Sequence, residues 1–129
     1  MAHHGFRILA LTLAIFLGVA VNGAHAQGSG TFNGASNHVT KGAVTVTKNA
    51  DGTATVTLAA DFWFDGAPDP HVGFGNNGSF SKSTNLGLLR SNSGEQSYTV
   101  PASINVDDFN EVYIWCVRFA VPLGVATIN

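Results

Sequence analysis

The sequence predicts an all-β protein: one antiparallel β-sandwich or flattened barrel, preceded by an export signal. Two observations support this fold class. Past residue 26 the chain has almost no helical periodicity, whereas short runs that alternate apolar and polar residues recur along it. Clusters of Gly, Pro, Asn and Ser separate these runs. Because many short strands without helices pack as layered or closed antiparallel sheets, we expect a single domain over residues 27–129.

The clearest predicted element is a hairpin formed by Ala43–Lys48 and Thr53–Leu58. In the first run Val44 and Val46 alternate with polar residues, and the second run alternates in the same way. The segment between them, Asn-Ala-Asp-Gly, is typical of a turn, because Gly52 adopts positive φ without steric cost. The two runs therefore predict paired antiparallel strands.

Weaker patterns of the same kind predict further strands, and loops rich in Gly, Pro, Asn or Ser join them. The predicted strands are Ser29–Phe32, His38–Lys41, Asp61–Phe64, His71–Gly75, Gln96–Val100, Glu111–Phe119 and Gly124–Ile128. The predicted loops include Asp65–Pro70, Asn76–Ser83 and Arg90–Gly94. One helical turn is expected at Asn105–Phe109, with Asn105 or Asp107 as its cap.

Residues 1–26 have the order of a secretory signal peptide. A weakly basic start that includes Arg7 precedes an uncharged run from Ile8 to Val21, and Ala24-His25-Ala26 follows. The run is shorter than the roughly 20 residues that cross a bilayer, so we expect cleavage after Ala26 rather than a membrane anchor. The mature chain, residues 27–129, contains no second run of membrane length. We therefore expect an exported protein, periplasmic or extracellular.

Composition excludes several classes of protein. Charged residues make up 11% of the chain, and Lys and Arg form no cluster, so nucleic-acid binding is not expected. The sequence contains 1 Cys, so the chain has no internal disulfide. A turnover enzyme is the least supported class, because there is no Gly-x-Ser-x-Gly elbow and no His near Cys116 in sequence.

Cys116 is the residue of greatest chemical interest. A single thiol in an exported protein is exposed to oxidation unless it is buried, ligated or used. Alternation along Glu111–Phe119 places Cys116 and Arg118 on one face and the aromatic residues, including Trp115, on the other. We expect the aromatic face to form the main core, with Arg118 favouring the thiolate. The opposing interpretation is that Cys116 is a space-filling core residue.

The mature chain contains two further candidate ligands, His38 and His71. One thiolate and two imidazoles compose a mononuclear copper electron-transfer site, and either ligand type also binds haem iron. The spacing is not specific, because the three residues are far apart and no Met is available as an axial ligand. A haem would be non-covalent, since no Cys-x-x-Cys-His motif occurs. The candidate cofactors are haem, copper or none.

An ordered series of motifs along the mature chain resembles the electron-transfer DM-thirteen domain family, over roughly residues 28 to 128. The motifs are Gly30-Thr-Phe-Asn-Gly-Ala-Ser-Asn-His38, Leu58, Asp61-Phe62, Pro68-Asp69-Pro70-His71-Val72, Leu86-Gly87-Leu88-Leu89, Gly94-Glu95-Gln96-Ser97-Tyr98, Pro101, Val112-Tyr113-Ile114-Trp115-Cys116, Phe119 and Gly124.

The resemblance implies an extracytoplasmic module that takes part in electron transfer. It implies that Cys116, in the Trp-Cys motif, is the proposed redox centre, as a bare thiol or as the ligand of a prosthetic group such as haem. His38 and His71 are then candidate partners of the sulfur, Arg118 and Trp115 candidate tuning residues, and the redox partner protein is unknown. The alternative is a non-redox binding or structural module, in which Cys116 fills the core.

Overall fold

The computed structural model describes residue 23 and residues 25–129, and the side chains from residue 28 onward. Most of the predicted signal peptide, residues 1–26, therefore lies outside the described residues. Two short 3-10 turns, η1 (Lys82–Thr84) and η2 (Val106–Asp108), accompany the strands. In the described part of the chain, no helix is both long enough and apolar enough to cross a membrane. The strands are β1 (His25–Thr31), β2 (Asn33–Gly34), β3 (Thr40–Lys41), β4 (Ala43–Lys48), β5 (Ala54–Leu58), β6 (Trp63–Phe64), β7 (Pro70–Asn76), β8 (Ser79–Phe80), β9 (Gln96–Val100), β10 (Glu111–Cys116) and β11 (Val121–Thr127).

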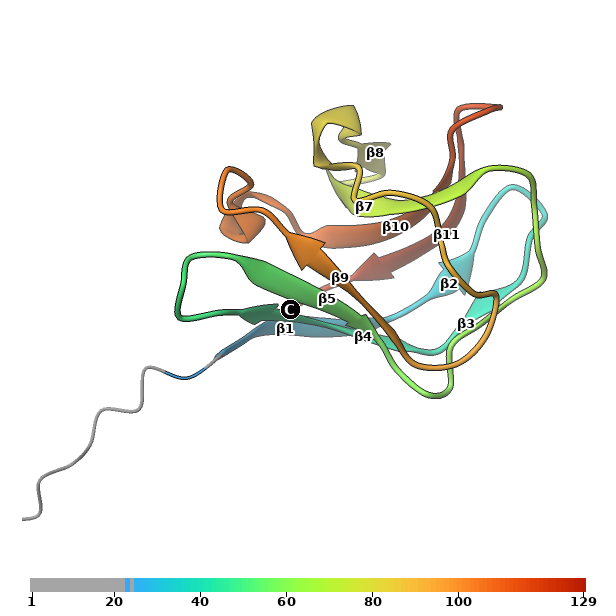
Figure 1. Ribbon diagram of the computed structural model, residues 1–129. Helices are drawn as coiled ribbons and strands as arrows, with labels where there is room; N and C mark the ends of the chain where they lie inside the picture. The colour runs from blue at the N-terminus through green and yellow to red at the C-terminus, as the bar shows by residue number, and fades with distance from the viewer. Residues whose placement is uncertain (1–22, 24) are drawn as a thin grey trace, which may run out of the picture.

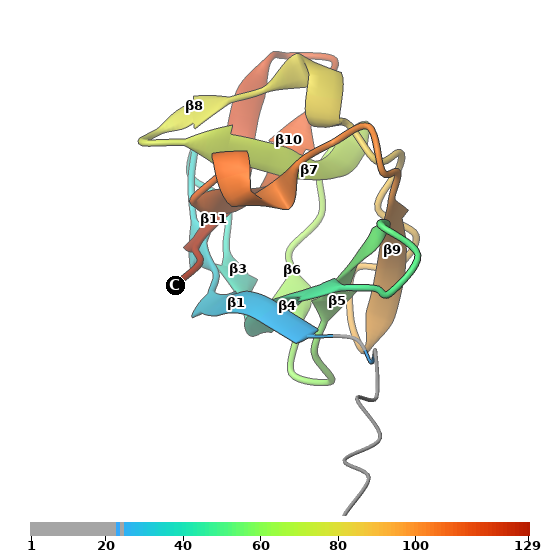
Figure 2. The ribbon, with the colours of Figure 1, turned by 90° about the vertical axis from the view of Figure 1, so that its left-hand side faces the viewer.

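The strands form two main antiparallel sheets that face each other (Figures 1 and 2). One sheet has the order β1-β4-β5-β9 and the other β2-β11-β10-β7-β8, while β3 and β6 form a small separate pair. At one edge the sheets are joined, because Ser29 and Asn129 exchange two backbone hydrogen bonds of 3.2 Å. The all-β sandwich prediction is confirmed, and this joined edge gives the sandwich some character of a flattened barrel.

The predicted hairpin is confirmed in detail. β4 and β5 pair antiparallel with Val44 opposite Leu58 and Val46 opposite Val56, and all four side chains are fully buried. Gly52 lies in the connecting turn at φ +89. β9 also has its predicted bounds and extends this sheet beyond β5. Each of these strands has one buried and one solvated face. Their apolar and polar residues therefore alternate, and this alternation predicted them correctly.

Several other elements differ from prediction at their ends. β10 stops at Cys116 rather than at residue 119, because a turn follows in which Ala120 has φ +51. β2 and β8 were not predicted, since two residues carry no alternation. The predicted helical turn exists as η2, and the Asn105 side chain caps it by accepting a hydrogen bond from the Asp107 amide.

The prediction that the aromatic face of β10 forms the main core is wrong. Val112, Ile114 and Cys116 point into the core between the sheets, with exposed fractions of 1% or less. Tyr113 and Trp115 point to the outer face, where β8 covers them: Phe80 packs at 5.5 Å from Tyr113 and 4.5 Å from Trp115, centroid to centroid. Both faces of β10 are thus covered by other parts of the chain. Apolar side chains occur on both faces, so the sequence alone did not show which face contacts the core.

Two glycines of β7 make room for this outer cover. Gly73 and Gly75 lie opposite Tyr113 and Glu111 in the ladder. A Cβ at Gly73 would lie 2.7 Å from Cε2 of Phe80, and one at Gly75 would lie 2.6 Å from Cε2 of Tyr113 and collide with the carbonyl oxygen of Ser79. A side chain at either position would therefore push the aromatic cover off the sheet.

We predict that Gly75→Ala lowers the free energy of unfolding by about 3 kcal/mol or more. The Ser79 backbone and the Tyr113 ring, which the new Cβ would approach, have no free space into which they can move. Urea unfolding followed by circular dichroism measures this. Gly78→Ala is the matched control: it has φ +87 and nothing within 4 Å of its Cβ, so it carries only a conformational cost of about 1–2 kcal/mol. Equal losses in the two variants would contradict the packing argument.

Candidate functional site

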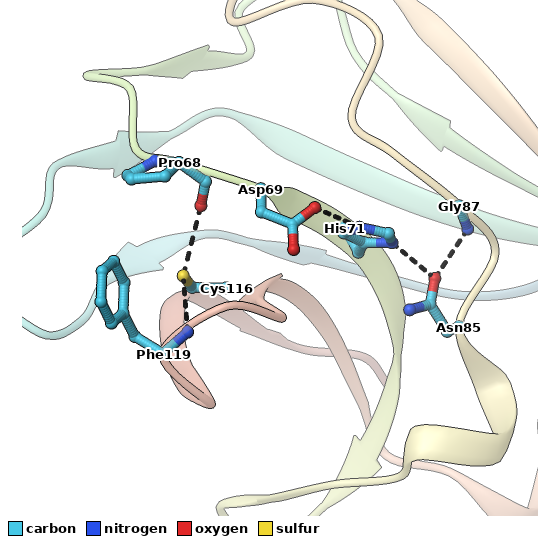
Figure 3. A network of polar contacts seen from close by, with 7 residues as sticks. All are labelled: Pro68, Asp69, His71, Asn85, Gly87, Cys116 and Phe119. Carbon is cyan, nitrogen blue, oxygen red and sulfur yellow. Dashed lines mark hydrogen bonds and ion pairs between the residues drawn. The ribbon is translucent and has the colours of Figure 1, made fainter.

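Cys116 lies at the last position of β10, where the strand leaves the core. Its exposed fraction is 1%. The thiol donates a hydrogen bond to the carbonyl oxygen of Pro68 at 3.2 Å, and the sulfur accepts one from the amide of Phe119 at 3.4 Å (Figure 3). The sulfur is therefore held between two backbone groups, one from the loop before β7 and one from the turn after β10.

Those two segments are also bonded to each other. The amide of Val117 donates to the carbonyl oxygen of Asp69 at 3.1 Å. All four residues of the turn 117–120 are exposed, and Phe119 has an exposed fraction of 62%. The sulfur is thus buried between the surface turn 117–120 and the loop before β7, next to polar backbone atoms as well as the apolar core.

Arg118 and Trp115 do not lie where the sequence analysis expected. Arg118 is in the exposed turn and not on the core face with Cys116, because the strand ends before it. Trp115 lies on the outer face and stacks on Phe80 at an interplanar angle of 13°. Tuning of the sulfur by either residue stays a prediction.

His71 lies on the outer face of the five-stranded sheet, opposite to Cys116. It pairs with Trp115 in the β7–β10 ladder, whereas Cys116 pairs with Pro70. Paired residues of an antiparallel ladder share a face, and successive residues alternate. The ring of His71 and the sulfur of Cys116 therefore point to different sides of the sheet.

Both ring nitrogens of His71 are hydrogen-bonded (Figure 3). Nε2 is 2.9 Å from Oδ1 of Asp69, and Nδ1 is 3.0 Å from Oδ1 of Asn85. The amide of Gly87 donates to the same Asn85 atom at 2.8 Å, which identifies that atom as the oxygen. Each ring nitrogen thus faces an oxygen acceptor within the protein, so the imidazole is held in place by Asp69 on one side and Asn85 on the other.

His38 is in a different part of the structure. Its Nδ1 is 2.9 Å from Oδ1 of Asp65, and the other carboxylate oxygen accepts the amide of Val39 at 3.0 Å. The Val39 amide first, and the His38 ring second, lower the pKa of the Asp65 carboxyl. This contact ties the loop before β3 to the end of β6.

The geometry does not fit the copper site considered above. Among residue 23 and residues 25–129, no three His, Cys, Asp or Glu side chains come together in a way that could hold a metal ion. The thiol of Cys116 donates to Pro68, and the ring of His71 lies on the opposite face of the sheet. Haem ligation does not fit either, because the buried sulfur faces two backbone groups at hydrogen-bond distance.

Sequence reasoning missed the groups that hold the sulfur and the imidazole. Pro68 and Phe119 act through backbone atoms, which their side chains do not reveal. Asn85 follows η1, outside every predicted strand and loop, and had no pattern to distinguish it. For Phe80 a signal existed: the spacing Gly73-x-Gly75 in a strand indicates a close approach by another part of the chain.

Comparison with known families gives one match. The model of the family described as Electron transfer DM13 matches residues 31–128. The chain belongs to this electron transfer DM13 family. The matched segment runs from the last residue of β1 past the end of β11, so it includes every candidate residue named above. The family resemblance inferred from the sequence is therefore confirmed. No curated protein and no solved structure matched the chain.

The DM13 domain contains one tyrosine whose ionisation reports on the outer cover. Tyr113 donates to Oε1 of Glu111 at 3.2 Å, and burial, followed by the charge of Glu111, raises the Tyr113 pKa to about 12. In the unfolded chain the Tyr113 hydroxyl ionises near pH 10.0. Below that pH the neutral hydroxyl makes its full contribution to the stability of the fold. It is lost as pH rises through about 12.

We predict that the free energy of unfolding falls by up to about 2–3 kcal/mol between these two pH values, and that Tyr113→Phe removes this fall. Urea unfolding across the pH range, with the ultraviolet absorbance of tyrosinate, measures it. Tyr98→Phe, on β9, is the control and retains the fall. Ionisation of Tyr113 at its ordinary pH would contradict the prediction.

Proposed function

We propose that the protein is an exported single-domain redox module, in which the sulfur of Cys116 is the electron-transfer centre. The observation that carries the proposal is the position of this sulfur in an electron transfer DM13 domain: it is held near the surface between the Pro68 carbonyl and the Phe119 amide. Its redox partner is a second, unidentified protein.

The contacts of the sulfur favour a bare thiol over a metal ligand. Without a prosthetic group, the chemistry available is a two-electron oxidation by a peroxide. With hydrogen peroxide, the sulfur attacks one oxygen atom, an S–O bond forms as the O–O bond breaks, and the products are a sulfenic acid and water. A thiol of the partner then attacks the sulfenic acid, releasing water and forming a mixed disulfide, and a second thiol restores Cys116 while the partner leaves as a disulfide. Access requires the surface cover of the sulfur to open, and a displacement of the Val117–Ala120 turn would break the hydrogen bond from Phe119.

A second function is supported by the burial itself. An exposed fraction of 1% and a place in the main apolar cluster are also what a structural cysteine has. In that case the domain is a non-redox binding or structural module. The loops near Phe62–Phe64 or Asn76–Ser83 then contact its ligand.

The two functions predict different behaviour of Cys116→Ser. For the redox module, mild peroxide adds one oxygen atom to the wild-type protein, thiols reverse this, and Cys116→Ser shows neither. Intact mass spectrometry and a redox titration of the purified mature chain measure the difference. Ile114→Val is the matched control, because it perturbs the same core face and keeps the thiol.

We expect Cys116→Ser to cost about 1–3 kcal/mol of stability in either case, since it places a hydroxyl in the core. Stability therefore does not separate the two functions. A wild-type thiol that stays unmodified by peroxide in the folded state, with partner binding intact in Cys116→Ser, would establish the structural role.

Export is part of the proposal and has its own test. When the full chain is expressed in a secreting host, the purified exported protein is expected to begin at Gln27, as determined by N-terminal sequencing. Ala26→Arg, which places a large charged side chain at the predicted cleavage position, is expected to retain residues 1–26. Recovery of the uncut wild-type chain inside the cell would contradict export.

A further inference from the structure

A pocket of about 200 Å³ opens on the outer face of the five-stranded sheet. It lies on the side of Trp115 and not on the side of Cys116. The redox proposal makes no use of it. Its lining residues are Phe80, Lys82, Asn85, Trp115, Val117 and Ala120.

One part of the lining is apolar and largely aromatic. Phe80 and Trp115 stack in parallel with their centroids 4.5 Å apart. Gly73 permits this stack, because any Cβ there would displace the Phe80 ring. Val117 adds an apolar side chain with an exposed fraction of 42%. Such a surface attracts a flat apolar ring by offset or edge contacts with the aromatic side chains.

The polar part of the lining consists of donors. Lys82 carries an ammonium group with three N–H bonds. The Asn85 side-chain oxygen already accepts from Gly87 and lies 3.0 Å from Nδ1 of His71, so the amide nitrogen, with two N–H bonds, is the group it can offer to a ligand. The lining contains no carboxylate. Asp69, which His71 connects to Asn85, is paired with His71 at 2.9 Å.

We infer that this pocket binds a small planar aromatic carboxylate of one or two rings. The aromatic part of the lining matches the ring, and the two donor groups match the carboxylate oxygens. The volume of the pocket limits the size of the ligand. An apolar cavity of about 150 Å³ holds benzene, and drug-sized ligands need about 300 Å³ or more. The pocket does not include the Cys116 sulfur, which lies on the other face of β10, although Val117 and Ala120 of the turn after β10 line it.

The test uses 2-naphthoate as the probe and the purified mature protein. We expect saturable changes in the NMR signals of the Trp115 indole N–H and of the backbone amides of Lys82, Asn85 and Val117. Cyclohexanecarboxylate has the same charge without an aromatic ring, and 2-naphthylmethylammonium has the ring with the opposite charge. Both are expected to bind at least about threefold more weakly than 2-naphthoate.

Variants then separate the two parts of the lining. Lys82→Gln is expected to weaken 2-naphthoate binding about threefold, and Phe80→Leu by a similar factor. Lys41→Gln, which removes a lysine on β3, is the matched control and leaves binding unchanged. Cys116→Ser is also expected to retain binding. The test of the pocket therefore gives a result that does not depend on whether Cys116 is a redox centre.

Three results would overturn the inference. One is equal binding of 2-naphthoate and cyclohexanecarboxylate, and another is equal affinity in wild type and Lys82→Gln. The third is a response confined to Trp63, the other tryptophan, which has an exposed fraction of 46% on β6. Chemical shifts distinguish a misfolded variant from a specific loss, because Phe80→Leu and Lys82→Gln must keep the core signals of Val112 and Ile114.

Discussion

Strand β10 is hydrogen-bonded to a neighbour on each side, and the candidate sites depend on that double pairing. β7 and β11 together fix its register. Because side chains alternate along a strand, a fixed register determines the face of the sheet to which each side chain of β10 points. Cys116 must point into the core and Trp115 away from it. The proposed redox centre and the proposed aromatic-acid pocket therefore occupy opposite faces of two consecutive residues.

One peptide of the loop before β7 connects the two faces. The carbonyl oxygen of Pro68 accepts the thiol of Cys116 on the inner side, and the carboxylate of the next residue, Asp69, holds His71 on the outer side. His71 in turn holds Asn85, a pocket residue. A displacement of the 68–69 peptide would thus change the surroundings of the sulfur and the orientation of the Asn85 amide together.

Regular alternation with one solvated face was predictable from the sequence. β4, β5 and β9 follow that rule, and their positions agree with the pattern within one residue. β10 breaks the rule because Phe80 covers its second face. The sequence alone therefore did not show which face of β10 contacts the core. The sulfur's partners are backbone groups of Pro68 and Phe119, which no side-chain pattern encodes. Motifs in order identified the family, but they did not place His71 and Cys116 on different faces.

The pairing of Ser29 with Asn129 brings the first strand of the domain and residue Asn129 to the same corner. The length of β11 separates that corner from the Val117–Ala120 turn. A tether or fusion attached at either terminus would leave the turn unobstructed. A short linker between the ends would also permit circular permutation, with new termini opened in a loop such as Arg90–Gly94 and the order of strands in each sheet kept.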